Sequence, residues 1–450
     1  MGTLFGTDGI RGVAGEPPLD RDDVYRIGYC LTGHLKAAHN QPHILIGRDT
    51  RVSGPWIEGL LQHAIEDAGG IAELCGIVST PAVSLLTQKA GAQAGIMISA
   101  SHNPYQDNGI KVFCSQGIKF NDAVEDALEK QILSSSLPAP NGFSRDPDTV
   151  AYNLRVAPQY QGLYADYVRS CLAPDFGLRG MRLVVDCAHG SLSLIAPAFL
   201  QNLGADVRAI HCRPDGRNIN HHAGALHLGA LQEQVRAQQA DLGIAFDGDA
   251  DRVMLVDAAG RIHDGDDMLY LLARYSDLNG APRTVVGTVM ANLGLEVALE
   301  KIGFNLVRTA VGDRYVLEEM MRLGAVIGGE QSGHIILTRL ARTGDGLLTG
   351  LKVLEILAQQ KQDLTTLCRP VTRFPQVLLN VGVREKVPFE NIPGLRETEA
   401  SCKAKLGTRS RILLRYSGTE KLARVMVEGE NEPAVKEAAH HLAKFFENMP

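Results

Sequence analysis

Short apolar runs rich in β-branched residues alternate with longer amphipathic stretches along most of the chain. The runs have the length of buried strands, and the stretches between them repeat apolar residues with the period of a helix. Strand–helix alternation at this spacing is typical of βαβ units, so the pattern predicts largely parallel sheets covered by helices. Predicted strands cover residues 43–47, 96–99, 183–186, 242–246, 284–289 and 326–328. Predicted helices cover residues 56–68, 191–203, 231–239, 293–301, 315–323 and 347–359.

The pattern changes near the C-terminus. Strands predicted at 376–383, 411–415 and 424–428 surround a helix near 394–405 and precede a last helix at 433–447, which starts with Pro433. Polar stretches at 141–156, 257–265 and 361–375 separate the parts. We therefore expect three similar α/β domains with mostly parallel mixed sheets plus a smaller C-terminal α+β domain, around a central cleft. The expected domains are 1–150, 151–257, 258–368 and 369–450.

Composition narrows the class of protein. The formal net charge of −6 argues against a nucleic-acid or membrane-surface partner, which favours a basic domain. None of the 8 cysteines forms a CxxC pair, so a zinc or thioredoxin-like site has no support. The first residues lack the basic and apolar regions of a signal peptide, and no apolar stretch reaches the ~20 residues of a membrane span. We expect a cytoplasmic enzyme.

Three aspartates lie between two apolar runs, at Asp247, Asp249 and Asp251. Carboxylates that alternate on a tight loop converge on one hard cation, which also relieves their mutual repulsion. An EF-hand loop would need Gly and Glu where this chain has Arg252 and Ala258. A haloacid-dehalogenase-type phosphatase would have Thr or Val in place of Asp251. We therefore predict a divalent metal site.

A second candidate site follows the predicted strand at 96–99. Ser101 lies in the segment SASHNP, at the carboxyl edge of a sheet where α/β folds place ligands. His102, Asn103 and Lys111 are donors for phosphate oxygens.

Further loops carry polar side chains. The glycine-rich segment 328–334 offers Glu330 and Ser332 for sugar hydroxyls and His334 for proton transfer. A Ser/Gly/Thr turn after Arg415 presents backbone amides and hydroxyls to an anion. The loop at 5–12 offers Arg11 to a phosphate, whereas we expect a structural ion pair in the loop at 47–51.

Five motifs occur in order along the chain: FGTDGIRG, SASHNP, DGDADR, GGEQSGH and RYSGTE. Together they resemble the α-D-phosphohexomutase family over nearly the whole length. The segments SASHNP, VGDRYV and EQSGH resemble most the bacterial members that act on glucosamine phosphates. The family usually has Pro after SGTE, where this chain has Lys421.

The resemblance implies a reaction. It is the interconversion of glucosamine 6-phosphate and glucosamine 1-phosphate, through a phosphoserine enzyme and a 1,6-bisphosphate, on the route to UDP-N-acetylglucosamine and peptidoglycan. The implied partner is a small hexosamine phosphate, with a homodimer as one expected assembly and no nucleic acid or membrane. Alternatives are the same chemistry on glucose or mannose phosphates, a metal-dependent phosphatase, and a sugar-phosphate sensor.

The resemblance also implies residue roles. One Mg2+ per chain would be held by Asp247, Asp249 and Asp251 together with a phosphate oxygen on Ser101. The catalytic residues would be Ser101, His102, Lys111, Arg252, His334 and Arg11. Glu330 and Ser332 would hold sugar hydroxyls. The distal phosphate would be bound by Arg415, Ser417, Gly418, Thr419 and Arg424.

Overall fold

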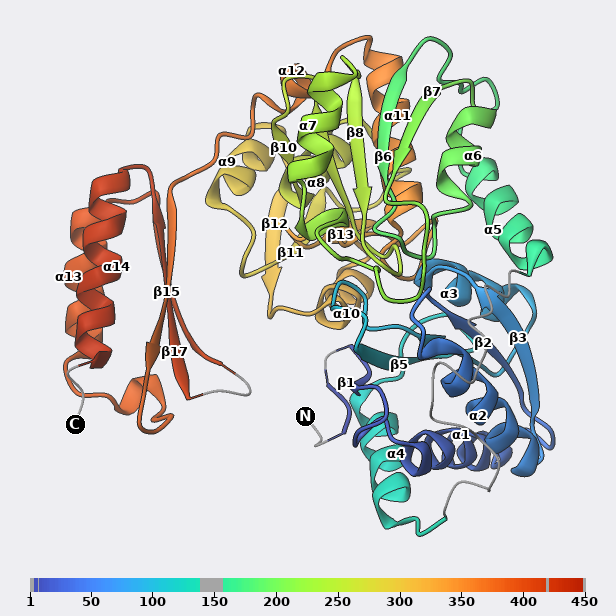
Figure 1. Cartoon of the computed structure of the whole chain (residues 1–450). Helices are drawn as coiled ribbons and strands as arrows, with labels where there is room; N and C mark the ends of the chain where they lie inside the picture. Colours follow the sequence, from blue (N-terminus) through green and yellow to red (C-terminus); the bar gives the residue numbers. More distant parts are fainter. Residues whose placement is uncertain (1–3, 7, 138–156, 418–420, 448–450) are drawn as a thin grey trace. The chain divides into compact units, whose positions relative to one another are not determined.

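The structure is a computed structural model that describes residues 4–6, 8–137, 157–417 and 421–447 (Figure 1). The polar stretch predicted at 141–156 lies outside these residues. The chain forms two compact units. Unit 1 comprises Met1–Val289 and Val307–Leu367, and unit 2 comprises Met290–Leu306 and Cys368–Pro450.

The first sheet of unit 1 has the strand order β1-β5-β4-β2-β3. Its strands are β1 (Ile10–Val13), β2 (His43–Arg48), β3 (Ile71–Ile77), β4 (Ala94–Ile98) and β5 (Asp107–Cys114). β2 is parallel to β3 and β4, whereas β5 is antiparallel to β4 and β1. Helices α1 (Arg21–Lys36), α2 (Gly54–Asp67) and α4 (Asp122–Ser134) share one core with Ile44 and Ile46. Helix α3 (Thr80–Lys89) covers the other face, where a Cβ on Gly47 or Gly95 would press on Val83.

The second sheet has the order β10-β9-β8-β6-β7. Its strands are β6 (Arg182–Asp186), β7 (Asp206–Ile210), β8 (Leu242–Phe246), β9 (Val253–Asp257) and β10 (Ile262–His263). β6 is parallel to β7 and β8, and β9 is antiparallel to both its neighbours. The accompanying helices are α5 (Pro158–Ser170), α6 (Ala196–Asn202), the short 3-10 helix η1 (Gly224–Leu226) and α7 (Gly229–Ala237).

The third sheet has the order β12-β11-β13-β14. Its strands are β11 (Thr284–Thr288), β12 (Asn305–Thr309), β13 (Ile327–Gly329) and β14 (Ile335–Leu337). Val316 and Met320 of α10 (Asp313–Leu323) pack against Val286 and Ile336 of this sheet. The other helices of this part are α8 (Gly265–Tyr275), α11 (Gly346–Gln360) and α12 (Leu364–Cys368).

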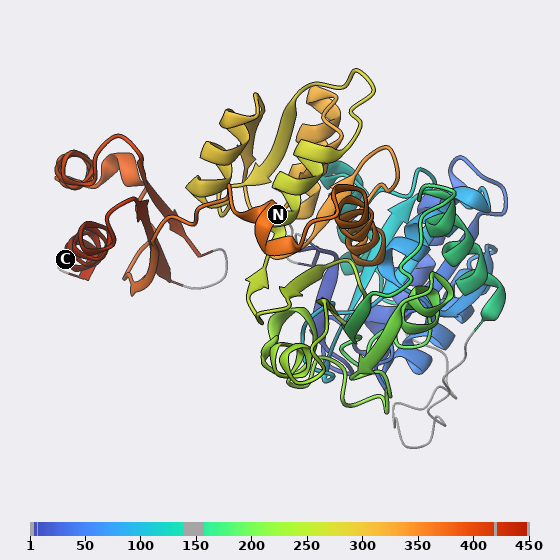
Figure 2. The ribbon, with the colours of Figure 1, turned by 90° about the horizontal axis from the view of Figure 1, so that it is seen from above.

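Unit 2 contains an antiparallel sheet of order β15-β17-β16. Its strands are β15 (Gln376–Gly382), β16 (Ser410–Tyr416) and β17 (Leu422–Gly429), and its helices are α9 (Leu293–Lys301), η2 (Phe389–Asn391), α13 (Leu395–Leu406) and α14 (Glu432–Glu447). Figures 1 and 2 show α13 and α14 on one face of the three strands. Ala423, Val425 and Val427 of β17 enter the core on this face. The alternate residues of β17, including Arg424, therefore point to the opposite face.

The predicted fold class of α/β domains with mixed sheets and a different C-terminal domain is confirmed. The helix predicted at 191–203 is shorter in the structure, where α6 begins at Ala196. The residues before α6 have another role. The backbone N–H of Ser191 donates to the carbonyl of Gly248 at 2.8 Å and so supports the loop that carries the three aspartates.

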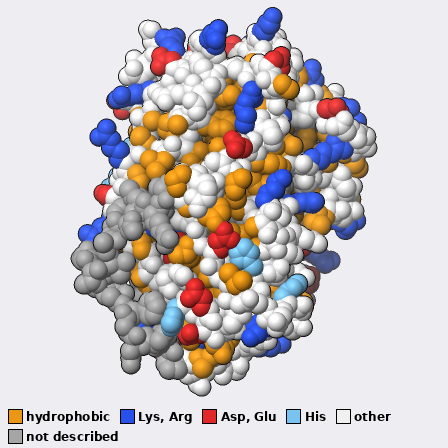
Figure 3. Space-filling view, turned by 90° about the vertical axis from the view of Figure 1, so that its right-hand side faces the viewer, with side chains coloured by type: hydrophobic (Ala, Val, Ile, Leu, Met, Phe, Trp, Pro, Cys, Tyr) orange, Lys and Arg blue, Asp and Glu red, His pale blue; other side chains and the backbone are white. Residues whose placement is uncertain are grey.

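The surface of unit 1 carries hydrophobic side chains in small groups among charged ones on the face shown in Figure 3. Within the described ranges, no helix is both long and apolar enough to cross a lipid bilayer.

Candidate active site

The predicted metal loop connects β8 to β9 in unit 1. Asp247, Asp249 and Asp251 are buried, and each offers an oxygen within 4.8 Å of the others. The Oδ1 atoms of Asp249 and Asp251 are buried and accept no hydrogen bond. Burial, followed by repulsion from Asp251 and Asp249, raises the pKa of Asp247 well above its usual range. Oxygen ligands of this kind fit a hard divalent cation, which would relieve the repulsion.

Ser101 lies in the loop between β4 and β5. Its hydroxyl donates a hydrogen bond to Asp247 Oδ2 at 2.6 Å, and the side chain is buried. The backbone has φ of 53°, a left-handed conformation that costs a non-glycine residue ~1–2 kcal/mol. Asn220 and Arg51 donate to the Ser101 carbonyl at 2.8 and 3.0 Å and hold this conformation.

The metal loop and the serine loop are in direct contact. A Cβ on Gly248 would lie 2.7 Å from the Ser101 carbonyl oxygen, which is closer than any side chain tolerates. Glycine at this position therefore allows the two loops to meet. The ends of β4 and β8, which belong to different sheets, bring the predicted nucleophile to the predicted metal ligands.

His102 lies beside the serine hydroxyl. Its Nδ1 is 3.3 Å from Ser101 Oγ. Burial lowers the pKa of His102 to about 4, and the charges of Arg252 and Arg11 act in the same direction. The imidazole is therefore neutral at pH 7 and is a hydrogen-bonding group rather than a cation.

Lys111 provides a buried positive charge on β5. Its Nζ is 2.8 Å from Asp249, 3.1 Å from Asp251 and 3.1 Å from Asp8. Burial opposes the charged form, but the carboxylates outweigh it and raise the pKa of Lys111 well above its usual range. Lys111 therefore stays cationic.

Two arginines complete the charged part of the site. The backbone N–H of Arg252 donates to Asp247 Oδ1 at 3.2 Å, and its guanidinium lies 3.9 Å from Asp251. Arg11 forms an ion pair with Asp8. The Nε atoms of both arginines are buried without a hydrogen-bond acceptor. Their unused donors suit an anionic ligand.

The loop between β13 and β14 carries the predicted sugar-binding residues. Glu330 accepts hydrogen bonds from the backbone of Gly312 at 3.1 Å and from Ser332 at 3.2 Å. His334 Nε2 accepts a bond from Gly344 N–H at 3.0 Å, and Nδ1 faces Asp251 at 3.7 Å. Burial opposes the imidazolium, but Asp251, Asp313 and Glu330 together raise the pKa of His334.

Sequence patterns missed several residues of this site. Thr80 donates its hydroxyl to Asp249 at 2.6 Å. Lys119 pairs with Asp313 at 2.6 Å and with Asp8. Asp8 lies in the glycine-rich motif at 5–12, and Asp313 in the segment VGDRYV, so proximity to motifs offered a signal for these two. Thr80 and Lys119 carried none.

The expected structural role of the loop at 47–51 is confirmed. Arg51 is fully buried and pairs with Asp49 at 2.9 Å. Its guanidinium also donates to the carbonyls of Asn103 at 2.9 Å and Asp107 at 2.9 Å. All its donors go to protein groups, so it holds the serine loop and leaves no donor for phosphate.

In unit 2, Arg415 and Arg424 lie directly opposite each other on β16 and β17. Burial and then the charge of Arg424 lower the pKa of Arg415. Ser417, which follows β16, is buried. Like charges directly opposite are destabilising without a counter-charge, so the pair suits an anion. Gly418 and Thr419, the other predicted phosphate ligands, lie outside the described residues.

Four family models match consecutive parts of the chain. They are described as phosphoglucomutase/phosphomannomutase alpha/beta/alpha domains I, II and III and the C-terminal domain, and they match residues 2–138, 163–260, 264–374 and 378–445. A curated relative, the phosphoglucosamine mutase of Solibacter usitatus, is 45% identical over 444 residues, or 98% of this chain and 97% of the relative.

Solved structures share the fold. A phosphoglucomutase/phosphomannomutase family protein from Burkholderia thailandensis has a TM-score of 0.79 at 23% identity, covering 99% of this chain and 98% of its own. The Aspergillus fumigatus N-acetylphosphoglucosamine mutase, in complex with GlcNAc-6P and magnesium, has a TM-score of 0.63 at 19% identity, covering 98% of this chain and 95% of its own.

Proposed function

Because the chain belongs to the phosphoglucomutase/phosphomannomutase family of α-D-phosphohexomutases, we propose that it is an isomerase that interconverts glucosamine 6-phosphate and glucosamine 1-phosphate. One observation carries the proposal. A buried serine hydroxyl lies 2.6 Å from one of three buried aspartates that form a candidate cation site. A binding protein has no need of such a pair. The four domains expected from the sequence are part of the same proposal.

Ser101 would carry the phosphate that the enzyme transfers. The bond between phosphorus and Ser101 Oγ breaks as a sugar hydroxyl attacks in line; the proton of that hydroxyl ends on Ser101 Oγ, and the product is a glucosamine 1,6-bisphosphate. The other phosphate then returns to Ser101 and restores the enzyme. Lys111, Arg11 and Arg252 would balance the charge of the transferred group, and His102, neutral beside Ser101 Oγ, would hydrogen-bond its oxygens.

The cation site would hold Mg2+ through Asp247, Asp249 and Asp251. A magnesium ion there supplies positive charge that stabilises the phosphoryl oxygens during transfer. The unbonded oxygens of Asp249 and Asp251 support this assignment, and the Aspergillus relative contains magnesium in its crystal structure.

The sugar and its second phosphate would be bound by other residues. Glu330 and Ser332 would hold sugar hydroxyls or the amine, with His334 at the reacting end of the sugar. Arg415, Ser417, Gly418, Thr419 and Arg424 would hold the phosphate that is not being transferred. The opposed pair Arg415 and Arg424 supports this second role, because a phosphate would neutralise both charges.

The substrate preference is tested by comparing kcat/KM for glucosamine 6-phosphate with that for the 6-phosphates of glucose and mannose. The assays contain Mg2+ and a trace of the matching 1,6-bisphosphate. We expect at least a tenfold preference for the amino sugar, or ~1.4 kcal/mol of transition-state discrimination. Faster turnover of glucose or mannose phosphate would keep the mechanism and reject the amino-sugar assignment.

The carrier role is tested with Ser101→Ala. We expect the variant to take up no phosphate from the 1,6-bisphosphate by intact-mass spectrometry, and to isomerise no sugar phosphate. The matched control is Ser115→Ala, which changes an exposed serine on the turn after β5. Phosphorylation of the Ser101→Ala protein, or its turnover at the wild-type rate, would overturn the proposal.

A further inference from the structure

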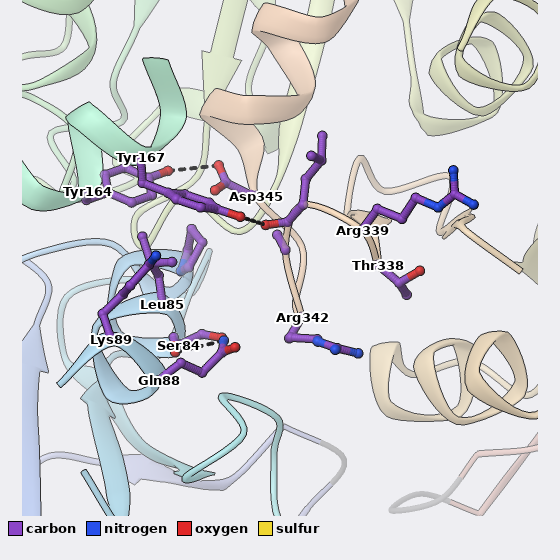
Figure 4. Close-up of a pocket in the computed structure, with 13 residues that line it drawn as sticks. Ser84, Leu85, Gln88, Lys89, Tyr164, Tyr167, Thr338, Arg339, Arg342 and Asp345 are labelled. Atoms are coloured by element: carbon purple, nitrogen blue, oxygen red, sulfur yellow. Dashed lines mark hydrogen bonds between the residues drawn. The ribbon is translucent and has the colours of Figure 1, made fainter. Parts of the chain in front are cut away.

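A buried hydrogen bond joins two segments beside the active site. The hydroxyl of Tyr164 on α5 donates to Asp345 Oδ1 at 2.8 Å, and both side chains are buried (Figure 4). Asp345 is the N-cap of α11, and the same oxygen accepts the backbone N–H of Leu348 at 2.9 Å. The phenol therefore fixes the residue that sets where α11 begins.

The two neighbours of Asp345 lie directly on the metal loop. Gly346 donates its N–H to the carbonyl of Ala250 at 3.0 Å, and Gly344 donates to His334 Nε2 at 3.0 Å. A Cβ on Gly346 would lie 2.4 Å from the Arg252 carbonyl oxygen. A Cβ on Gly344 would lie 2.6 Å from the carbonyl oxygen of Asp251. No side chain fits between this segment and the loop, so a shift of Asp345 displaces the loop or opens a gap.

The helix that carries Tyr164 also contacts the segment on the other side of the metal loop. Helix α5, which carries Tyr164, packs against helix α3. Ser79 is the N-cap of α3, and the next residue, Thr80, holds Asp249 through both its backbone N–H at 2.9 Å and its hydroxyl at 2.6 Å. Helix α5 thus packs against the support on α3, and the hydroxyl of Tyr164 holds the support at the start of α11.

We propose that Tyr164 and Asp345 are positioning residues that hold the three aspartates in the arrangement that binds the divalent cation. They touch neither substrate nor cation and act through Gly344 and Gly346. Loss of the phenolic hydroxyl would let the segment at the start of α11 relax and weaken cation binding. The inference rests on the metal site of the proposed function, and the experiment separates the two.

Tyr167 provides a matched control on the same helix. It lies one turn further along α5, and its hydroxyl donates to the carbonyl of Leu340 at 2.5 Å. Figure 4 shows this bond beside the one between Tyr164 and Asp345. The partner of Tyr167 is a backbone oxygen that contacts neither the α11 cap nor the metal loop. Removing either hydroxyl costs one hydrogen bond, but only Tyr164→Phe disturbs the cation site.

The test measures binding of Mn2+ alone to the full-length phosphorylated protein by electron paramagnetic resonance titration. We expect Tyr164→Phe to weaken Mn2+ affinity about fivefold, the size of one lost hydrogen bond, and Tyr167→Phe to stay within about twofold of wild type. Asp345→Asn keeps an oxygen that accepts both bonds and should bind like wild type. Asp345→Ala should weaken binding at least as much as Tyr164→Phe.

The outcomes are distinguishable. If the wild type binds no Mn2+, the metal site of the proposed function is wrong. If the wild type binds and Tyr164→Phe binds equally well, or Tyr167→Phe is weakened to the same extent, only the positioning role is overturned. If Tyr164→Phe does not fold, by circular dichroism, the pair Asp345→Ala and Asp345→Asn decides: equal Mn2+ affinity in these two overturns the role.

Discussion

The hydroxyl of Ser101 donates a hydrogen bond of 2.6 Å to Asp247, a residue 146 positions further along the chain. The contact joins the carboxyl ends of β4 and β8, which belong to different sheets. The oxygen proposed to carry the phosphate is therefore already bonded to a proposed metal ligand. This placement requires the left-handed backbone at Ser101 and the absence of a side chain at Gly248.

Charge repulsion among the three aspartates makes the stability of the protein depend on the metal. We expect Mg2+ to raise Tm, and a chelator to reverse the rise, because a ligand at 100 times its Kd stabilises by ~2.7 kcal/mol. Asp247→Asn removes one of the three charges. It should raise the Tm of the metal-free protein and reduce the rise caused by Mg2+. Differential scanning fluorimetry measures both values.

Asp206→Asn is the control for this experiment, because Asp206 is exposed on β7. It should leave the response to Mg2+ unchanged. An equal rise of Tm with Mg2+ in Asp247→Asn and wild type would contradict a cation site at the three aspartates.

Arg415 and Arg424 lie opposite each other in unit 2, and we expect the loss of one of them to weaken substrate binding without lowering Tm. Arg415→Gln should raise the KM for glucosamine 6-phosphate about tenfold or more, since hydrogen bonds to charged groups contribute ~1.5–3 kcal/mol. Its Tm should stay the same or rise, because the change removes one of two like charges that face each other. Arg409→Gln, an exposed arginine paired with Glu430, should change neither value. A fall in Tm with unchanged KM would show that Arg415 is structural.

The strands that end at the site were predictable, and the interactions between distant residues were not. The strand at 242–246 and the helix at 293–301 have the predicted bounds, because both are apolar runs with clear flanking signals. The three aspartates were found because they are close in sequence. Lys119 and Asp313 pair across 194 positions, and only the packing of the sheets brings them together. No local pattern carries that information.

Asp345 predicts a dependence of stability on pH. Burial raises the pKa of Asp345 from 3.8 to about 6, although its hydrogen bonds act the other way. The protonated carboxyl of Asp345 therefore contributes to the stability of the folded protein. This contribution is fully present below the pKa of the unfolded state and is lost as the pH rises through about 6. Asp345→Asn has no such proton. Its Tm relative to wild type should therefore increase from pH 4 to pH 7, by an amount equivalent to at most about 3 kcal/mol.

Other titrating groups are common to both proteins in this comparison, so the difference in Tm isolates Asp345. The measurement is thermal unfolding by circular dichroism at several pH values, in the presence of a chelator. A difference in Tm that is constant from pH 4 to pH 7 would contradict the raised pKa.

Arg51 predicts the largest loss of stability. Its buried guanidinium serves the carboxylate of Asp49 and the backbone carbonyls of the serine loop. Arg51→Met leaves Asp49 buried without its cation, a defect that typically costs ~3–5 kcal/mol, and leaves the carbonyls without donors. Urea unfolding should show this loss, whereas Arg213→Ala, at an exposed arginine, should unfold like wild type.

The double variant Asp49→Asn, Arg51→Met should recover part of the loss, because it removes the unpaired charge but not the unpaired carbonyls. Full recovery of the free energy of unfolding would mean that the contacts of Arg51 with the carbonyls do not contribute to stability. The serine loop would then keep its conformation, and Ser101 its phosphate uptake, without Arg51.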